Sequence, residues 1–281
     1  MLTAPKYLAL LLLVSAAGLA QSKKSIFMIT DAEGVAGVCR QDQTDPKDSE
    51  MRQLLTGEIN AAVQGFLDGG ADEVIVWDGH DGSQTLSALT IHPRAKLIIG
   101  NLGLTMLMER GYGALAFVGQ HAHANSRGGV MAHSYSSLGI QNMLMNGKPV
   151  GEIETRAALA GAFRVPTIFL SGDQAAAADL HAIVPQAETV VVKEGLSNYT
   201  CISLSAEEAR KQIRAGARSS MQKIQSIPPY RLEGPVTFQI EYTSRNALPV
   251  DIPAGAEMVD ARTVRYRGKD FLDAWKQYRG R

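Results

Sequence analysis

Three pairs of possible metal ligands each follow a short apolar segment of the sequence. Residues 25–30, 73–78 and 114–119 are apolar, and the pairs at or after their ends are Asp31 with Glu33, Asp78 with His80, and His121 with His123. Members of each pair are two residues apart, so they project to the same side of an extended chain. The repeated pattern predicts that three strand ends present ligands to one small volume.

The residue types in these pairs indicate which ion they could bind. Carboxylate oxygens mixed with imidazole nitrogens suit Zn²⁺ or Mn²⁺ better than Ca²⁺, which takes oxygen ligands. A lone aspartate at a strand end is more often a turn or helix cap, and a lone histidine is more often structural. Three pairs at successive strand ends favour a metal site, although spacing does not say which member of each pair binds.

The elements that would position these pairs form an alternating pattern. The apolar segments 25–30, 73–78, 114–119 and 166–171 are short and unalternating, which is typical of buried parallel strands. Helical patterns over 50–68 and 152–163 lie between strands. The sequence therefore predicts a doubly wound α/β fold with a mostly parallel sheet, in which ligands bind outside the carboxyl ends of the strands.

The pattern changes near residue 200. A helix is expected after Ser205, followed by strands over 235–242 and 262–268 and a terminal helix over 269–279. This order predicts a smaller C-terminal α+β unit. We therefore expect a metal-binding catalytic α/β domain over 24–203 and a smaller α+β domain over 204–281.

The first twenty residues have the layout of a secretory signal peptide. Lys6 precedes an apolar stretch from Tyr7 to about Val14, and small residues end at Ala20. This layout predicts a cleaved leader over 1–20 and an exported protein, periplasmic or secreted, with no stable membrane insertion afterwards; a buried helix and a retained anchor are the alternatives. In an exported protein the two cysteines, Cys39 and Cys201, could form a disulfide, but spacing alone cannot show that they meet.

The composition excludes some classes of partner. The 281 residues include 28 Lys and Arg and 28 Asp and Glu. No net field therefore favours nucleic acid or an anionic membrane surface. A small or neutral partner is expected.

Five motifs resemble one known family in order and spacing. They are "DAEGVAGV" (31–38), "DGH" (78–80), "VGQHA" (118–122), "GVMAHS" (129–134) and "GKPVGE" (147–152). Together they resemble the zinc-dependent D-aminopeptidases associated with dipeptide transport operons. The resemblance extends from about residue 25 to 200 and is weaker beyond.

The resemblance implies two zinc ions and a set of site residues. The implied zinc ligands are Asp31, Glu33, His80, His121 and Glu152, with Asp31 bridging both ions. His133 matches the family's catalytic histidine, which acts in proton transfer or as the nucleophile. The family motif does not require His123, for which a pocket role at most, and more readily a structural one, is expected. The family also implies a ring-shaped homo-oligomer.

We therefore expect an exported metallo-aminopeptidase that hydrolyses the first peptide bond of short peptides. A hydroxide held by two zinc ions would attack the carbonyl while His133 moves the proton; a preference for D-residues is implied by the resemblance alone. Asp78 or Asp173 could hold the substrate amine, or could equally be caps. One alternative is a periplasmic peptide-binding protein without catalysis. The other is a two-metal hydrolase of an ester or phosphate ester, in which Arg127 would be the residue to hold a phosphate.

Overall fold

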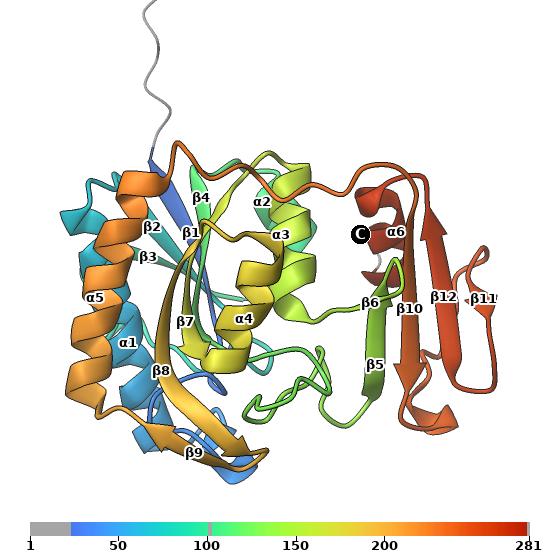
Figure 1. Ribbon diagram of the computed structural model, residues 1–281, viewed down its shortest axis with the longest axis horizontal. Coiled ribbons are helices and arrows are strands. Elements are labelled where there is room, and N and C mark those ends of the chain that lie inside the picture. Colours follow the sequence, from blue (N-terminus) through green and yellow to red (C-terminus); the bar gives the residue numbers. More distant parts are fainter. Residues whose placement is uncertain (1–23, 101–102, 280–281) are drawn as a thin grey trace, which may run out of the picture.

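The computed structural model describes residues 24–100 and 103–279, which form two β-sheets and their covering helices (Figure 1). The predicted signal peptide lies outside the described residues. Among the residues that are described, no helix is both long enough and apolar enough to cross a bilayer.

The larger sheet holds the strands that the sequence predicts, with further strands at both edges. Its order is β3 (Ala95–Ile98), β2 (Glu73–Asp78), β1 (Ser25–Thr30), β4 (Ala114–Gln120), β7 (Thr167–Asp173), β8 (Glu188–Ser197) and β9 (Thr200–Ser203). All neighbours are parallel except β8 and β9. The residues of β1, β4 and β7 are buried throughout, which explains why these strands read as apolar runs without alternation.

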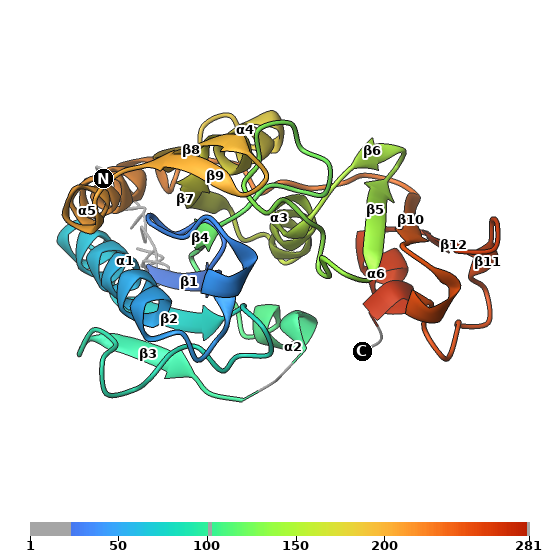
Figure 2. The ribbon, with the colours of Figure 1, turned by 90° about the horizontal axis from the view of Figure 1, so that it is seen from below.

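Helices cover both faces of this sheet, as Figures 1 and 2 show. On one face lie α1 (Ser49–Asp68) and α5 (Ala206–Lys223), which pack against each other. On the other lie α2 (Leu104–Met108), α3 (Glu152–Ala162) and α4 (Gln174–Ile183). Asp48 caps α1 by accepting from the Met51 amide (2.7 Å), and Ser205 caps α5, in line with their preference for helix starts. The predicted doubly wound α/β fold is confirmed.

The strand order reverses between β1 and β4. Strands β2 and β3 extend the sheet on one side of β1, whereas β7 and β8 extend it on the side of β4. Ligand sites of doubly wound sheets lie at such a reversal. Just after the end of β1, the Asp31 amide donates to the carbonyl of Val118 in β4 (2.9 Å). Gly119 has φ +72°, and a Cβ there would lie 2.1 Å from the Asp31 carbonyl oxygen, so a glycine is needed for this close approach.

A smaller antiparallel sheet stands beside the first. Its order is β11 (Glu257–Met258), β12 (Thr263–Gly268), β10 (Val236–Tyr242), β5 (Ile140–Met145) and β6 (Lys148–Pro149). Helix α6 (Phe271–Arg279) packs on β10 and β12 and also contacts α3. Aromatic rings, including Phe238, Phe271 and Trp275, fill the space under α6.

Packing crosses the predicted boundary at residue 203 in both directions. Strands β5 and β6 precede that residue yet belong to the smaller sheet, whereas α5 follows it and packs on α1 of the larger unit. The sequence of β5, "IQNMLM", alternates only weakly between apolar and polar residues, so this strand is hard to predict. The two sheet units are therefore interleaved along the chain.

A disulfide joins Cys39 to Cys201, whose Cα atoms are 6.2 Å apart. Cys39 lies in the loop after β1, and Cys201 lies in the edge strand β9. The Gly37 amide also donates to the Ser203 hydroxyl (2.8 Å). The loop that leaves β1 is thus fixed to the edge of the larger sheet.

Candidate functional site

The residues that the sequence singled out gather at the reversal point of the sheet in two groups. Asp31, Glu33 and His80 form the first group, and His121, His133 and Glu152 form the second. Within each group the possible ligand atoms lie within 4.8 Å of one another. All six residues are buried except His133, which is half-buried. The structure thus brings together every residue predicted for the site.

Asp31 lies between the two groups. Its Oδ1 is 3.0 Å from Nδ1 of His80, and its Oδ2 is 3.7 Å from Nε2 of His121. Each carboxylate oxygen therefore faces a different group. This is the arrangement that a carboxylate bridging two ions requires.

Several buried atoms at the centre of the site have no hydrogen-bond partner. His121 donates from Nδ1 to the Ala122 carbonyl (2.9 Å), and its Nε2 has no hydrogen-bond partner. The Oε2 atom of Glu152 also has no hydrogen-bond partner, and Oε2 of Glu33 faces only Nδ1 of His80, at 3.3 Å. Buried polar atoms are nearly always satisfied, and these three are the donors that Zn²⁺ takes. The residues present therefore fit zinc.

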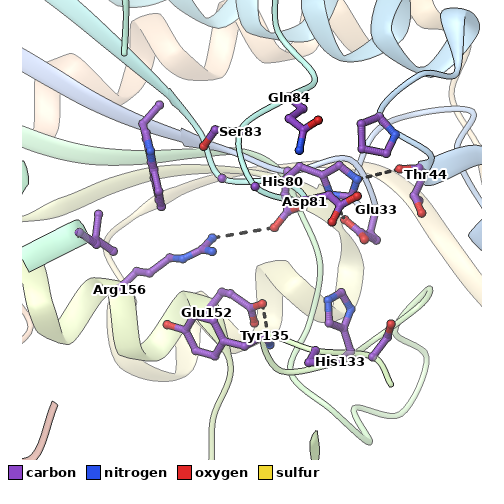
Figure 3. A pocket seen from close by; sticks show the side chains of 18 of the residues that line it. Glu33, Thr44, His80, Asp81, Ser83, Gln84, His133, Tyr135, Glu152 and Arg156 are labelled. Atoms are coloured by element: carbon purple, nitrogen blue, oxygen red, sulfur yellow. Dashed lines mark hydrogen bonds and ion pairs between the residues drawn. The ribbon is translucent and has the colours of Figure 1, made fainter. Parts of the chain in front are cut away.

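His80 has its second nitrogen fixed by the backbone. Nε2 donates to the Thr44 carbonyl (2.8 Å; Figure 3). Nδ1 therefore faces the carboxylates of Asp31 and Glu33. Burial disfavours the charged ring, but the two carboxylates raise the pKa of His80 to about 12. A ligating histidine commonly donates its other ring N–H to such a partner. Sequence reasoning missed Thr44, which ends the short 3-10 helix η1 (Gln41–Thr44).

Arg156 and Gln120 support Asp31 from the side of the sheet. Gln120 donates to Oδ2 of Asp31 (3.2 Å), and Nη1 of Arg156 lies 3.9 Å from the same oxygen. Burial works to raise the pKa of Asp31, but its hydrogen bond to His80 and the surrounding positive charges hold that pKa well below its usual range. The sequence held one signal for Arg156, since it lies four residues after Glu152 and shares its helix face.

Glu152 begins α3, and its carboxylate is held by a loop. The Tyr135 amide donates to its Oε1 (2.7 Å). In the same loop, His133 donates from Nδ1 to the Met131 carbonyl (3.0 Å) and stacks on His121, with ring centres 4.0 Å apart. The loop between β4 and β5 therefore carries His133 back over the strand end.

His123 lies apart from His121 in a different group. It accompanies Glu154 and Asp179, and its amide donates to the Asp179 carboxylate (3.0 Å). Its ring faces Asp179 (Nε2 to Oδ1, 3.6 Å) and does not line the cavity described below.

The two carboxylates considered for the substrate amine are both caps. Asp78 accepts from the Thr85 amide (2.7 Å), and Asp173 accepts from the Ala176 amide at the start of α4 (2.8 Å). Neither residue lines the cavity. Of the two expectations for this pair, the structure favours the capping one.

The site opens into a cavity of about 1080 Å³. Figure 3 shows Glu33, His80 and Asp81 on one side and His133, Tyr135 and Glu152 across from them. Elements from both sheet units contribute to the walls, since α6 supplies Trp275 and Arg279. A cavity of this size accommodates a small organic molecule or a short peptide.

A doubly wound sheet with zinc-type donors at its reversal point, open to a peptide-sized cavity, defines a metal-dependent hydrolase. Comparison with known families places the chain within this class. The chain belongs to the D-aminopeptidase family, peptidase family M55, whose model matches residues 25–279. The resemblance seen in the sequence is thereby confirmed.

Known relatives agree with this assignment. The chain is 28% identical over 260 residues to the D-aminopeptidase of Bacillus subtilis (strain 168), covering 89% of this chain and 94% of the relative. Its structure is similar to that of the zinc-dependent D-aminopeptidase DppA from Bacillus subtilis, described as a self-compartmentalizing protease. That match has a TM-score of 0.81 and 26% identity, and it covers 90% of this chain and 95% of the other.

Proposed function

We propose that the chain is an exported two-zinc aminopeptidase that releases the N-terminal residue of short peptides and prefers D-residues there. The observation that carries this proposal is the position of Asp31 between two ligand groups, in which buried atoms of His121 and Glu152 have no hydrogen-bond partner. In a peptide-binding pocket without metal, these buried atoms would be expected to have hydrogen-bond partners.

Five side chains would hold the two ions, namely Asp31, Glu33, His80, His121 and Glu152. Bound zinc activates water at neutral pH and polarises a carbonyl group. The chain's own groups supply the rest. The Thr44 carbonyl fixes the orientation of His80, and Gln120 orients Asp31.

His133 is the proposed proton carrier. Its Nδ1 is engaged with the Met131 carbonyl, so its Nε2 is the atom free to exchange a proton, and the residue lines the cavity. An imidazole serves as both base and acid near neutral pH. His133 would accept a proton as the water attacks and deliver it to the leaving amine.

Three further parts of the proposal have separate support. The D-preference follows the names of the family and of its relatives. A closed homo-oligomer follows the description of DppA as self-compartmentalizing. Export is supported by the layout of residues 1–20 and by the disulfide between Cys39 and Cys201, because disulfides persist mainly in oxidising compartments.

One experiment tests the catalytic proposal. The purified protein is assayed for metal and for cleavage of paired dipeptides that differ only in the configuration of the first residue. We expect about two zinc ions per chain and faster cleavage of the D-series. A D-series cleaved no faster than its L-partner contradicts the proposed preference, and a protein with well under one zinc and no hydrolysis after zinc is added is better described as a binding protein.

The Asp31→Ala variant is the negative control for zinc binding and hydrolysis. It should lose both zinc and activity, because Asp31 contacts both ligand groups. Retained zinc stoichiometry would contradict the bridging role. Mass spectrometry of the exported protein tests the leader, because we expect the mature chain to begin at Gln21. The size of the protein in solution tests whether it forms an oligomer.

A further inference from the structure

The C-terminal helix α6 brings a guanidinium group to the cavity. Arg279 lines the cavity together with Trp275, although α6 packs mainly on the smaller sheet. Cζ of Arg279 lies 4.7 Å from the ring centre of Tyr135 and 5.5 Å from that of Tyr278. Aromatic rings hold a guanidinium by its face. Arg279 also hydrogen-bonds the Tyr278 side chain, and its other N–H groups are available to an anion.

Arg279 differs from the other arginine in the cavity wall. Arg156 donates to Gln120 (3.3 Å) and lies 3.9 Å from Asp31, so its charge is already engaged. Among residues 24–100 and 103–279, no carboxylate is within ion-pair distance of Arg279, although the charge of Glu152 acts on it from farther away. On the side of the cavity formed by α3 and α6, Arg279 is therefore the cation that can receive a carboxylate from a ligand.

The charges of the cavity are polarised. Asp42, Asp45 and Asp81 line it on the side of His80 and outnumber Lys47, the cation that lines the same side. Arg279 lies on Tyr135, which Figure 3 places across the cavity from Asp81. A peptide with a free amine and a free carboxylate has the complementary polarity, because its ammonium group suits the acidic side and its carboxylate suits the arginine.

Arg279 also lies near the candidate zinc ligand Glu152. Tyr135 connects them, since its amide donates to Glu152 (2.7 Å) and its ring carries Arg279. One residue therefore separates a candidate zinc ligand from the guanidinium. Because an extended peptide covers about 3.5 Å per residue, substrates of a few residues would reach from one to the other.

We propose that Arg279 binds the C-terminal carboxylate of the substrate and so selects di- and tripeptides with a free C-terminus. This inference rests on the proposed aminopeptidase function and adds a residue that measures substrate length. A planar guanidinium binds a carboxylate through two parallel hydrogen bonds, which a neutral C-terminal amide cannot reproduce.

The test compares D-alanyl-glycine with its C-terminal amide, using the zinc-loaded full chain. Wild type should cleave the free acid with a kcat/KM at least about tenfold higher than the amide. In Arg279→Gln the ratio of kcat/KM for the acid to kcat/KM for the amide should fall to about one, mainly through a higher KM for the acid. Because acid and amide are compared within one variant, a loss of folded protein cancels from the ratio.

Lys276→Gln is the matched control. It removes the same charge from the same helix, but Lys276 is exposed and does not line the cavity, so it should keep the wild-type preference. Equal kcat/KM of wild type for acid and amide, or an equal loss for both in Arg279→Gln, overturns this inference alone. Hydrolysis of neither substrate by wild type overturns the proposed function and this inference together.

Discussion

The rings of His121 and His133 lie face to face, with centres 4.0 Å apart and planes 16° apart. Each ring donates from Nδ1 to a nearby backbone carbonyl, that of Ala122 or Met131. Both therefore keep Nε2 for the site, where Glu152 completes the group. The two histidines thus have the same backbone hydrogen bond, but we assign them different roles: His121 is the proposed zinc ligand and His133 the proposed proton carrier.

Replacing these two histidines one at a time separates the roles. His133→Ala should keep zinc but lower kcat by at least about a hundredfold, as expected for a general acid–base group. His121→Ala should lose zinc, because its unpaired Nε2 is buried between Asp31 and Glu152. Metal analysis after gel filtration, with kcat on the same sample, decides between them. A His133→Ala protein as poor in zinc as His121→Ala would make His133 a ligand.

His123→Ala should affect activity far less than either change. Its ring faces Asp179 rather than the candidate zinc ligands, and its fixed contact with Asp179 is made by the backbone amide, which alanine retains. The measurement is zinc content and kcat/KM beside wild type. A loss as deep as that of His121→Ala would show that the wrong member of this pair was chosen from the sequence.

The strands that end at the site were the elements best predicted from the sequence. β1, β2 and β4 are short apolar runs, and β1 and β4 are buried throughout, so their bounds could be predicted almost to the residue. The rule that parallel strands end at one edge then reached the three ligand pairs. The family resemblance selected His80 and His121 from their pairs. The strand rule could not reach Glu152, which starts a helix and was found through the family resemblance.

The opposite wall of the cavity could not be predicted from local patterns. Tyr135 lies in an irregular loop and has φ +62°. Arg279 belongs to α6, whose amphipathic pattern reflects its packing on the smaller sheet and does not point to the cavity. Their meeting depends on how β5 pairs with β10, a contact between distant segments. Pairing between distant strands leaves little trace in either segment alone.

Lys193 offers a test of the loop that carries Glu33. Its buried ammonium group donates to the carbonyls of Glu33, Val35 and Val38. Lys193→Met would leave these carbonyls unsatisfied, so we expect the free energy of unfolding to fall by roughly 3 kcal/mol and zinc to bind more weakly. Thermal unfolding and zinc titration check this, with the exposed Lys211→Met as control. Unchanged zinc affinity would contradict a role for Lys193 in placing Glu33.

Glu58 should make stability depend on pH. Burial raises the pKa of Glu58 to about 7, above its ordinary value of 4.5, although the Ala36 amide and the charge of Lys193 oppose this. The folded protein thus holds this proton more tightly than the unfolded chain, and stability falls as the pH rises from about 4.5 to about 7.

Glu58→Gln keeps the acceptor for Ala36 and removes the titration. Its free energy of unfolding should match that of wild type near pH 4.5 and exceed it at pH 8 by roughly 3 kcal/mol, which is the free-energy equivalent of the difference between the folded and unfolded pKa values. Denaturant unfolding at several pH values measures this, and the exposed Glu50→Gln on the same helix should show no such trend. A Glu58→Gln protein less stable than wild type at pH 8 would mean that Lys193 stabilises the ionised carboxylate.

The interleaving of the two sheet units also sets an order of assembly. Every candidate zinc ligand lies at or before Glu152, whereas the wall that holds Trp275 and Arg279 is made last, when α6 packs beneath β10 and β12. Chains generally acquire structure from the N-terminus as they emerge. The centre that would carry out hydrolysis can therefore form on a nascent chain, before the wall that would recognise a peptide is in place.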